Sequence, residues 1–181
     1  MAIQIGQKQE SDFSNPLGML SDCHRRIEHF LDVLVRVCGR AKGRSLEPEE
    51  KVALQKALAY FRNSAPKHTA DEEESLFPRL RGSPEASSSL DGLRELEQEH
   101  QLAARDHQIV ERFGTRWVDG ERLTSDQVLE LEKALERLYE LYRRHIAVED
   151  GELFPLAAKL LRSEELSAVG REMADRRNVK L

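Results

Sequence analysis

The chain has 181 residues, enough for one domain with a sizeable core. Charged residues make up 34% and aromatic residues only 6%, and a composition rich in alanine, glutamate, leucine and arginine favours an all-α protein. The net charge of −5, with both signs interspersed, excludes the electrostatic footprint of a protein that binds nucleic acid or an anionic membrane. No apolar run reaches 18 residues, so no transmembrane segment is expected.

The first 13 residues are polar and are expected to form a flexible leader, residues 1–13. A first helix is predicted to begin at Asn15 and Pro16, which suit the N-cap and the first helical position, and to end at about residues 39–43. Its apolar residues recur at helical spacing on one face, and His24 lies on that face.

Two cysteines, Cys23 and Cys38, lie on this first helix. At 1.5 Å per residue they are about 22 Å apart along the helix axis, too far for a disulfide. Reduced thiols are typical of the cytosol, so a cytoplasmic location is expected.

A second helix is predicted from Pro48 to about Arg81. Its inward stripe ends in His68 and Glu72. Pro66 lies inside this helix and predicts a kink or local unwinding just before His68, because proline removes a backbone donor and its ring clashes with the preceding turn.

A loop rich in small residues, 82–89, separates this helix from a third one, predicted at about 89–114. His100 and His107 lie in the inward stripe of the third helix. Residues 113–123 are expected to form the next connection.

A fourth helix is predicted after Thr124 or Ser125 as N-cap and runs to about Leu161. Its inward stripe ends in His145 and Glu149. Four long amphipathic helices with short connections favour an antiparallel up-down-up-down four-helix bundle.

The bundle is expected to occupy residues 14–161, and residues 162–181 a C-terminal helix and tail. Ser163 can cap this short fifth helix, predicted at 163–176 and expected to pack outside the bundle. The last six residues are expected to fray. The arginine pairs of the chain are interpreted as solvated helix faces: 25–26, 143–144 and 176–177.

One pattern occurs twice, in residues 68–78 (HTADEEESLFP) and 145–155 (HIAVEDGELFP). Each copy has a histidine, a glutamate four residues later and then Leu-Phe-Pro, and the i, i+4 spacing places both side chains on one helix face. His24 precedes the first copy by 44 residues and His100 precedes the second by 45. The chain is therefore an internal repeat of two helical halves.

Counting residues from each predicted turn places the four inward histidines at nearly one height in the bundle, within about one helical turn. A single inward histidine is more often a hydrogen-bonded core residue, but a buried carboxylate is costly unless it is paired or bound to metal. Imidazole and carboxylate donors suit iron, and manganese or zinc less specifically. The predicted metal ligands are His24, His68, Glu72, His100, His145 and Glu149.

For the polar residues near the predicted ligands, the sequence pattern indicates a role less strongly. His29 points off the inward face and is expected to be exposed. His107 lies two turns from His100, about 10 Å along the axis, and Tyr142 lies one turn before His145; core roles are favoured for both. Glu73 and Asp150, beside the ligand glutamates, are expected to face solvent or to contact the ligands.

The order His24, His68-x-x-x-Glu72, His100, His145-x-x-x-Glu149, with the Leu-Phe-Pro continuations, resembles the hemerythrin-like (HHE cation-binding) domain family over about residues 14–161. The resemblance implies a centre of two Fe ions with an oxo or hydroxo bridge. It also implies that both glutamates bridge the irons and that two histidines bind each iron. Oxygen-carrying hemerythrins have a further histidine one turn after the third-helix histidine, where this chain has Ala104.

The function expected from this resemblance is a non-haem di-iron protein that binds, senses or scavenges O2, nitric oxide or peroxide, with no catalytic residue assigned. One alternative is a di-iron enzyme with peroxidase-like, catalase-like or iron–sulfur repair activity, for which Tyr142 and His107 are candidate acid–base groups. The other alternative is a helical interaction module stabilised by a mononuclear or zinc site. The expected partner is a small diatomic molecule or peroxide, not nucleic acid or membrane, and the protein partner stays open.

Overall fold

The computed structural model describes residues 10–83 and 90–181, and the regular secondary structure within these ranges is entirely helical, with no strand. The all-α prediction is confirmed. The leader and the loop at 82–89 fall largely outside the described residues. The first helix, α1 (Pro16–Ala41), begins as predicted: the Asn15 side chain accepts a hydrogen bond from the Gly18 N–H at 3.2 Å.

The second predicted helix is divided into α2 (Pro48–Asn63), α3 (Ala65–Ala70), η1 (Asp71–Leu76) and α4 (Phe77–Arg81). The interruption at Ser64, with φ −108° and ψ −44°, confirms the predicted kink before His68. Segment η1 is a π-helical turn, which the sequence reading did not anticipate.

The third helix, α5 (Leu90–Val118), is longer than predicted, so the assignment of 113–123 to a connection is wrong for its first six residues. Phe113 and Trp117 continue the buried stripe, and the Trp117 indole N–H donates to the Arg44 carbonyl at 2.6 Å. Gly114 does not break the helix. It lies against Leu58, and a Cβ there would come within 2.8 Å of the leucine side chain, so glycine permits close packing of α5 on α2.

The fourth predicted helix comprises α6 (Ser125–Val148), a second π-helical turn η3 (Glu149–Leu153), and α7 (Phe154–Leu160). Thr124 is the N-cap, and its hydroxyl accepts from the Gln127 N–H at 3.3 Å. The last helix is α8 (Ser163–Arg176). The prediction that Ser163 caps it is wrong, since Arg162 is the N-cap and its N–H donates to the Glu165 carboxylate at 3.0 Å.

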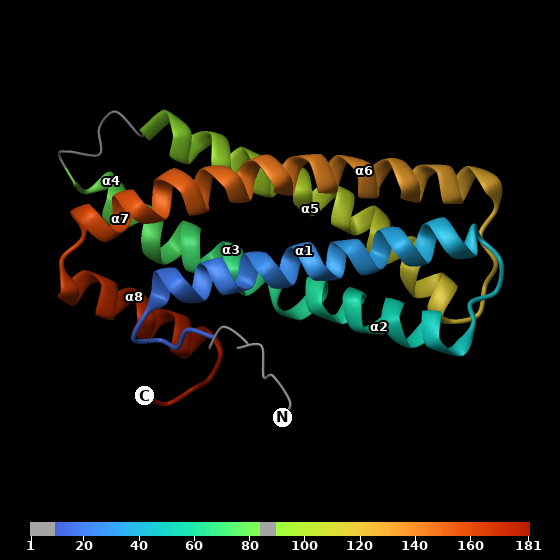
Figure 1. The fold of residues 1–181 in the computed structure, drawn as a ribbon, viewed down its shortest axis with the longest axis horizontal. Coiled ribbons are helices and arrows are strands. Elements are labelled where there is room, and N and C mark those ends of the chain that lie inside the picture. Colours follow the sequence, from blue (N-terminus) through green and yellow to red (C-terminus); the bar gives the residue numbers. More distant parts are fainter. Residues whose placement is uncertain (1–9, 84–89) are drawn as a thin grey trace, which may run out of the picture.

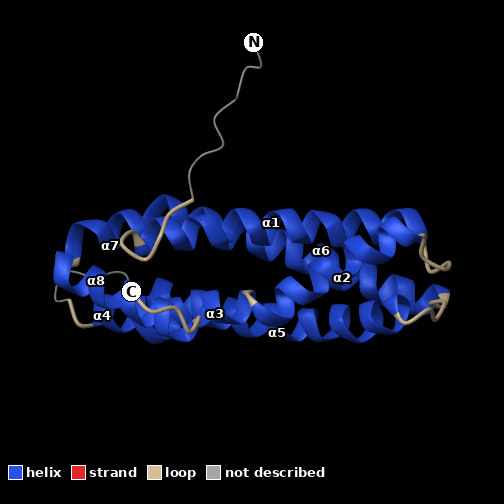
Figure 2. Cartoon of the chain, turned by 90° about the horizontal axis from the view of Figure 1, so that it is seen from below, coloured by secondary structure: helices blue, strands red, loops and turns tan. Residues whose placement is uncertain are grey.

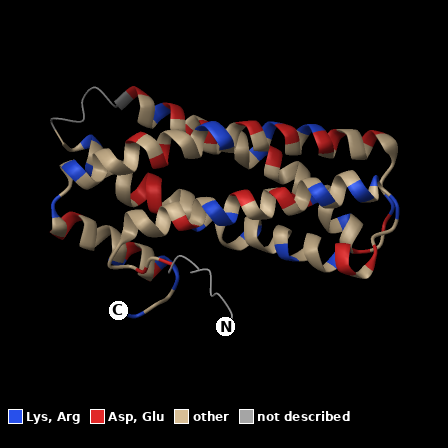
Figure 3. Cartoon of the chain, viewed as in Figure 1, with Lys and Arg blue, Asp and Glu red and all other residues tan. Residues whose placement is uncertain are grey.

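The long helical segments lie side by side, with the connections at the two ends of the molecule (Figures 1 and 2). Helix α1 packs against α2 and α6, and α5 packs against the same two helices. Helix α8 packs outside them, against η1 and α1. Charged side chains of both signs are interspersed along these helices (Figure 3). None of the helices in the described ranges is both long and apolar enough to cross a membrane.

The buried apolar residues form two clusters along the bundle. On α1, Leu20 belongs to one cluster and Ile27 to the other, and His24 lies between them. On α5, His100 likewise separates Leu96 from Ala103. A buried polar layer therefore crosses the hydrophobic core.

The C-terminal arginines are anchored, so the expectations that they fray or form a solvated face are wrong. Arg176 and Arg177 form ion pairs with Asp71 at 2.9 and 2.6 Å. Asp71 is fully buried, and each arginine side chain is 19% exposed. Because a buried carboxylate needs a partner, these pairs attach α8 to η1.

Candidate metal centre

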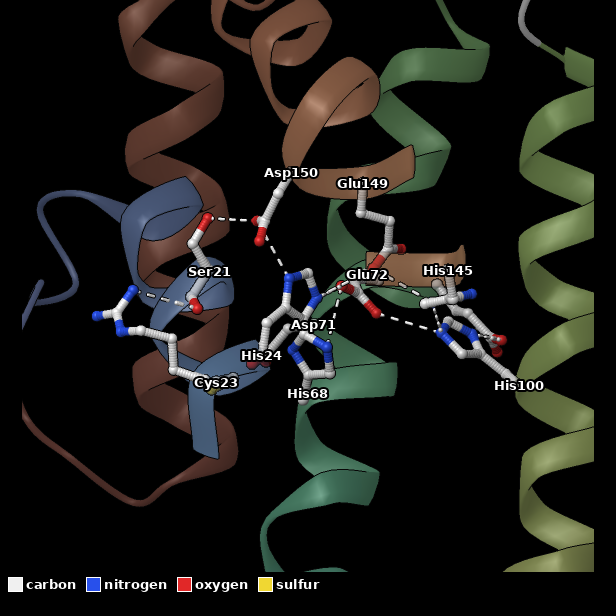
Figure 4. Close-up of polar contacts among 12 residues, drawn as sticks. Ser21, Cys23, His24, His68, Asp71, Glu72, His100, His145, Glu149 and Asp150 are labelled. Carbon is white, nitrogen blue, oxygen red and sulfur yellow. Dashed lines mark hydrogen bonds and ion pairs between the residues drawn. The ribbon is translucent and has the colours of Figure 1, made fainter. Parts of the chain in front are cut away.

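The six predicted ligand residues converge in the polar layer (Figure 4). They come from six segments, and all are buried. The segments and their residues are α1 with His24, α3 with His68, η1 with Glu72, α5 with His100, α6 with His145, and η3 with Glu149. This arrangement agrees with the prediction that the four inward histidines lie at nearly one height in the bundle.

Their donor atoms form two groups that share both glutamates. One group contains His24 and His68 and the other contains His100 and His145. Glu72 faces both groups through different oxygens: Oε1 lies 3.3 Å from His68 Nε2, and Oε2 lies 3.4 Å from His100 Nε2.

Glu149 faces both groups through a single oxygen. Its Oε2 lies 3.0 Å from His24 Nε2 and 3.2 Å from His145 Nε2. Donor atoms bound to one transition metal at about 2.1 Å are roughly 3 Å apart. The two groups therefore have the spacing of two adjacent coordination sites.

The π-helical turns begin at or just before these glutamates. In both copies the phenylalanine of Leu-Phe-Pro bonds five residues back: Phe77 N–H to Glu72 O, and Phe154 N–H to Glu149 O. The following proline lacks an N–H and cannot continue the ordinary i to i−4 ladder. The duplicated Leu-Phe-Pro thus accompanies a duplicated local widening of the helix at the glutamates, a feature common at functional sites.

Several donor atoms of this cluster are buried and have no hydrogen-bond partner within the described part of the chain. They include both carboxylate oxygens of Glu72 and Glu149, and Nε2 of His24. Leaving such groups unpaired in a low-dielectric interior is costly, and a cation at each group would satisfy them. The chemistry and burial of these residues therefore fit bound metal.

The metal-free site shows strong electrostatic coupling. Burial alone would lower the pKa of His24, but Asp150, Glu149 and Glu72 outweigh it and raise the pKa to about 12. Burial is likewise outweighed at His100 by Glu72 and Glu73, which raise its pKa to about 9. The carboxylates around these two rings therefore favour the protonated imidazole.

His68 differs from these two histidines. Burial dominates there and lowers the pKa to about 4, although Glu72 opposes the shift. The carboxyl of Glu72 has a pKa well below its usual range because the surrounding histidines outweigh its burial.

A second ring of carboxylates contacts the Nδ1 atoms of the histidines. Glu73 Oε1 lies 2.8 Å from His100 Nδ1, and Asp150 Oδ1 lies 3.1 Å from His24 Nδ1. Both residues were expected to face solvent or to contact the ligands, and both contact a histidine of the cluster while remaining partly exposed. Glu99 was missed; its Oε2 lies 2.9 Å from His145 Nδ1. The contact joins α5 to α6, so only the matched heights of two helices could have indicated it.

The remaining predicted residues are placed as follows. His29 is exposed, as expected. Tyr142 is buried and its hydroxyl is hydrogen-bonded to His107 Nε2 at 2.9 Å. Burial lowers the pKa of His107 to about 4 and raises the pKa of Tyr142. Ala104 is exposed.

Two hollows adjoin the histidine side of the cluster. A small cavity of about 10 Å³, lined by all four ligand histidines and Tyr142, has room for about one water-sized molecule. A larger pocket of about 680 Å³ includes Ala104 and His107 in its wall. Tyr142, His100, Ala65 and Thr69 line both hollows and form the partition between them.

The helical fold and the paired histidine–glutamate groups define a class of protein built to bind metal cations. The chain belongs to the hemerythrin HHE cation-binding domain family, whose model matches residues 15–157. It is also similar to an uncharacterized protein of Haemophilus influenzae, with 30% identity over 181 residues covering 98% of this chain and 99% of the relative.

Proposed function

We propose that this protein is a non-haem di-iron protein that binds, senses or scavenges O2, nitric oxide or peroxide. The observation that carries the proposal is the sharing of Glu72 and Glu149 by two histidine pairs. Two carboxylates and four imidazoles suit two iron ions better than one. The antiparallel up-down-up-down bundle and a cytoplasmic location belong to this proposal.

Each histidine pair would bind one of the two irons. His24 and His68 would hold one iron and His100 and His145 the other, with Glu72 and Glu149 between them. Bound iron would supply an open coordination position and a change of redox state. The small cavity beside the four histidines has room for about one water-sized molecule, so it excludes larger organic ligands from the centre.

The wall of this cavity is partly polar and partly apolar. Ile27 and Ile146 line it together with the histidines. Tyr142 is the neutral polar group at its edge, and the hydrogen bond to His107 fixes the tyrosine hydroxyl. A small ligand would therefore reach the centre through the partition that Tyr142, Thr69 and Ala65 form with the larger pocket.

Metal analysis of the purified protein tests the proposal. We expect two irons per chain and a charge-transfer absorption band that shifts on addition of nitric oxide or peroxide. A Glu149→Ala variant should lose the band. One zinc per chain, with no affinity for iron, would instead favour a metal-stabilised interaction module.

A di-iron enzyme is the second candidate, and the Tyr142–His107 hydrogen bond beside the cavity favours it. A hydroxyl held by a buried neutral imidazole can move a proton during peroxide or iron–sulfur chemistry. Peroxide turnover by wild type and by Tyr142→Phe and Glu149→Ala variants tests this candidate. Equally slow turnover by all three would reject it.

A further inference from the structure

The two histidine pairs are held differently by the second ring of carboxylates. In the His100–His145 pair, both imidazoles make a hydrogen bond through Nδ1, to Glu73 at 2.8 Å and to Glu99 at 2.9 Å. These bonds direct Nε2 of each ring toward the shared glutamates. Both rings of this pair are therefore fixed in tautomer and in orientation.

In the His24–His68 pair, this support is incomplete. His24 Nδ1 lies 3.1 Å from Asp150 Oδ1, a longer contact than the 2.8 Å between His100 Nδ1 and Glu73. His68 Nδ1 is buried and has no hydrogen-bond partner among residues 10–83 and 90–181. Asp150 also accepts a hydrogen bond from Ser21 at 2.7 Å, which shares its carboxylate between two partners.

The internal repeat locates the origin of this difference. Glu73 and Asp150 each follow a shared glutamate, and each contacts the first histidine of the opposite half. Glu99 directly precedes His100, and the corresponding position before His24 is Cys23. The Cys23 thiol accepts from Arg26 at 3.1 Å, and among the described residues no hydrogen bond joins it to His68. One carboxylate of the second ring is thus missing from the first half.

A carboxylate that accepts from the Nδ1–H of a ligand histidine raises the basicity of Nε2, and its removal typically costs about 10- to 100-fold in metal affinity. We propose that the two metal positions are unequal: the His100–His145 position binds a divalent cation first and more tightly, and Glu99 is the positioning residue that sets this order. The inference rests on the proposed dinuclear centre. The His24–His68 position is then the second to fill and the first to exchange its metal.

Titration of the metal-free protein with Co²⁺ tests the order of filling. We expect two cations per chain in two steps whose dissociation constants differ by about 10- to 100-fold. His145→Ala should abolish the tight step, and His68→Ala should retain it. Two cations with a single affinity, or loss of the tight step in His68→Ala alone, would overturn the inference. Fewer than two cations in wild type would reject the dinuclear centre itself.

The role of Glu99 is tested by Glu99→Gln, which keeps the side-chain size. We expect about a 10- to 100-fold weaker tight step, without an equal change in the weak step. Asp150→Asn should weaken only the weak step. Glu95→Gln is the matched control, since Glu95 is exposed on the same helix. If Glu99→Gln and Glu95→Gln bind Co²⁺ alike, with circular dichroism confirming folded variants, Glu99 does not set the order.

Discussion

Asp71 and Val148 occupy the same position in the two halves of the chain, directly before the shared glutamates, yet their surroundings are opposite. Asp71 is fully buried and paired with Arg176 and Arg177 of α8, whereas Val148 is 41% exposed. The first π-helical turn is therefore held from outside the bundle, whereas the corresponding position at the second turn faces solvent. The two copies of the histidine–glutamate motif are therefore stabilised by different contacts.

The two halves also differ in the residues that lie beside the histidines along the helices. Leu31 and Ala65 in the first half correspond to His107 and Tyr142 in the second, seven residues after the first histidine and three before the second histidine. The first half is apolar at this level, whereas the second half has a partly buried hydrogen bond. The ligands are symmetric, but their surroundings are not.

The largest effect on metal binding is expected from removing a glutamate that both histidine pairs share. Glu149→Ala should reduce bound metal from two cations per chain to at most one and weaken the remaining one by at least about a hundredfold, more than the typical effect of an outer contact. Metal analysis after dialysis measures this change. Glu152→Ala, on the same turn but exposed, is the control. Retention of two cations by Glu149→Ala would show that the carboxylate is not shared.

The support from α8 can be removed without touching a ligand. The double variant Arg176→Ala/Arg177→Ala leaves the buried Asp71 carboxylate unpaired, and it should lower the free energy of unfolding by about 3–5 kcal/mol. Urea unfolding of the metal-free protein measures this. Arg122→Ala/Arg143→Ala, which removes two exposed arginines, should change the free energy by less than about 0.5 kcal/mol. Equal effects would mean that α8 does not anchor η1.

The pH dependence of stability also differs between the halves, because His107 can titrate and the corresponding Leu31 cannot. The pKa of His107 is lowered by burial to about 4, below the ordinary value of 6.5, so the unfolded chain binds the proton more strongly. Its contribution to stability is complete above pH 6.5 and is lost as pH falls through 4.

Between pH 7.5 and 4.5, wild type should lose about 2–3 kcal/mol that a His107→Gln variant does not lose. Urea unfolding of the metal-free proteins at both pH values measures the difference. His29→Gln removes an exposed histidine and should retain the wild-type pH dependence. A His107→Gln variant with the wild-type dependence would contradict a buried neutral imidazole.

The smallest expected effect is that of Tyr142→Phe. Loss of the hydroxyl leaves His107 Nε2 unpaired and should cost about 1–2 kcal/mol. Tyr139→Phe on the same helix is the control, because Tyr139 is 49% exposed. Thermal unfolding compares the two variants. If the two variants are equally stable, the Tyr142–His107 hydrogen bond does not contribute to the stability of the second half.

Much of the polar layer could be predicted from the sequence, because i, i+4 spacing and residue counts along helices determine both face and height. His68, Glu72, His145 and Glu149 were indicated by the repeat alone. Glu99 could not be found in this way, because its contact with His145 depends on how α5 and α6 face each other. The pairing of Asp71 with the terminal arginines depends on where α8 docks, which helical periodicity does not determine.

The end of α5 shows a second limit. Glycine is a weak helix former, so the segment around Gly114 was assigned to a connection. Packing against Leu58, together with burial of Trp117, outweighs that local preference. Tertiary contacts determined this boundary.

The central claim is that each half contributes two histidines and one glutamate to one dinuclear centre, despite the different surroundings of the halves. Mössbauer spectroscopy of the protein reconstituted with ⁵⁷Fe and oxidised tests it most directly. We predict two irons per chain that are antiferromagnetically coupled, with quadrupole doublets and no magnetic splitting in a weak applied field at low temperature. A magnetically split spectrum of isolated ferric ions, at one iron per chain, would contradict a centre shared through Glu72 and Glu149.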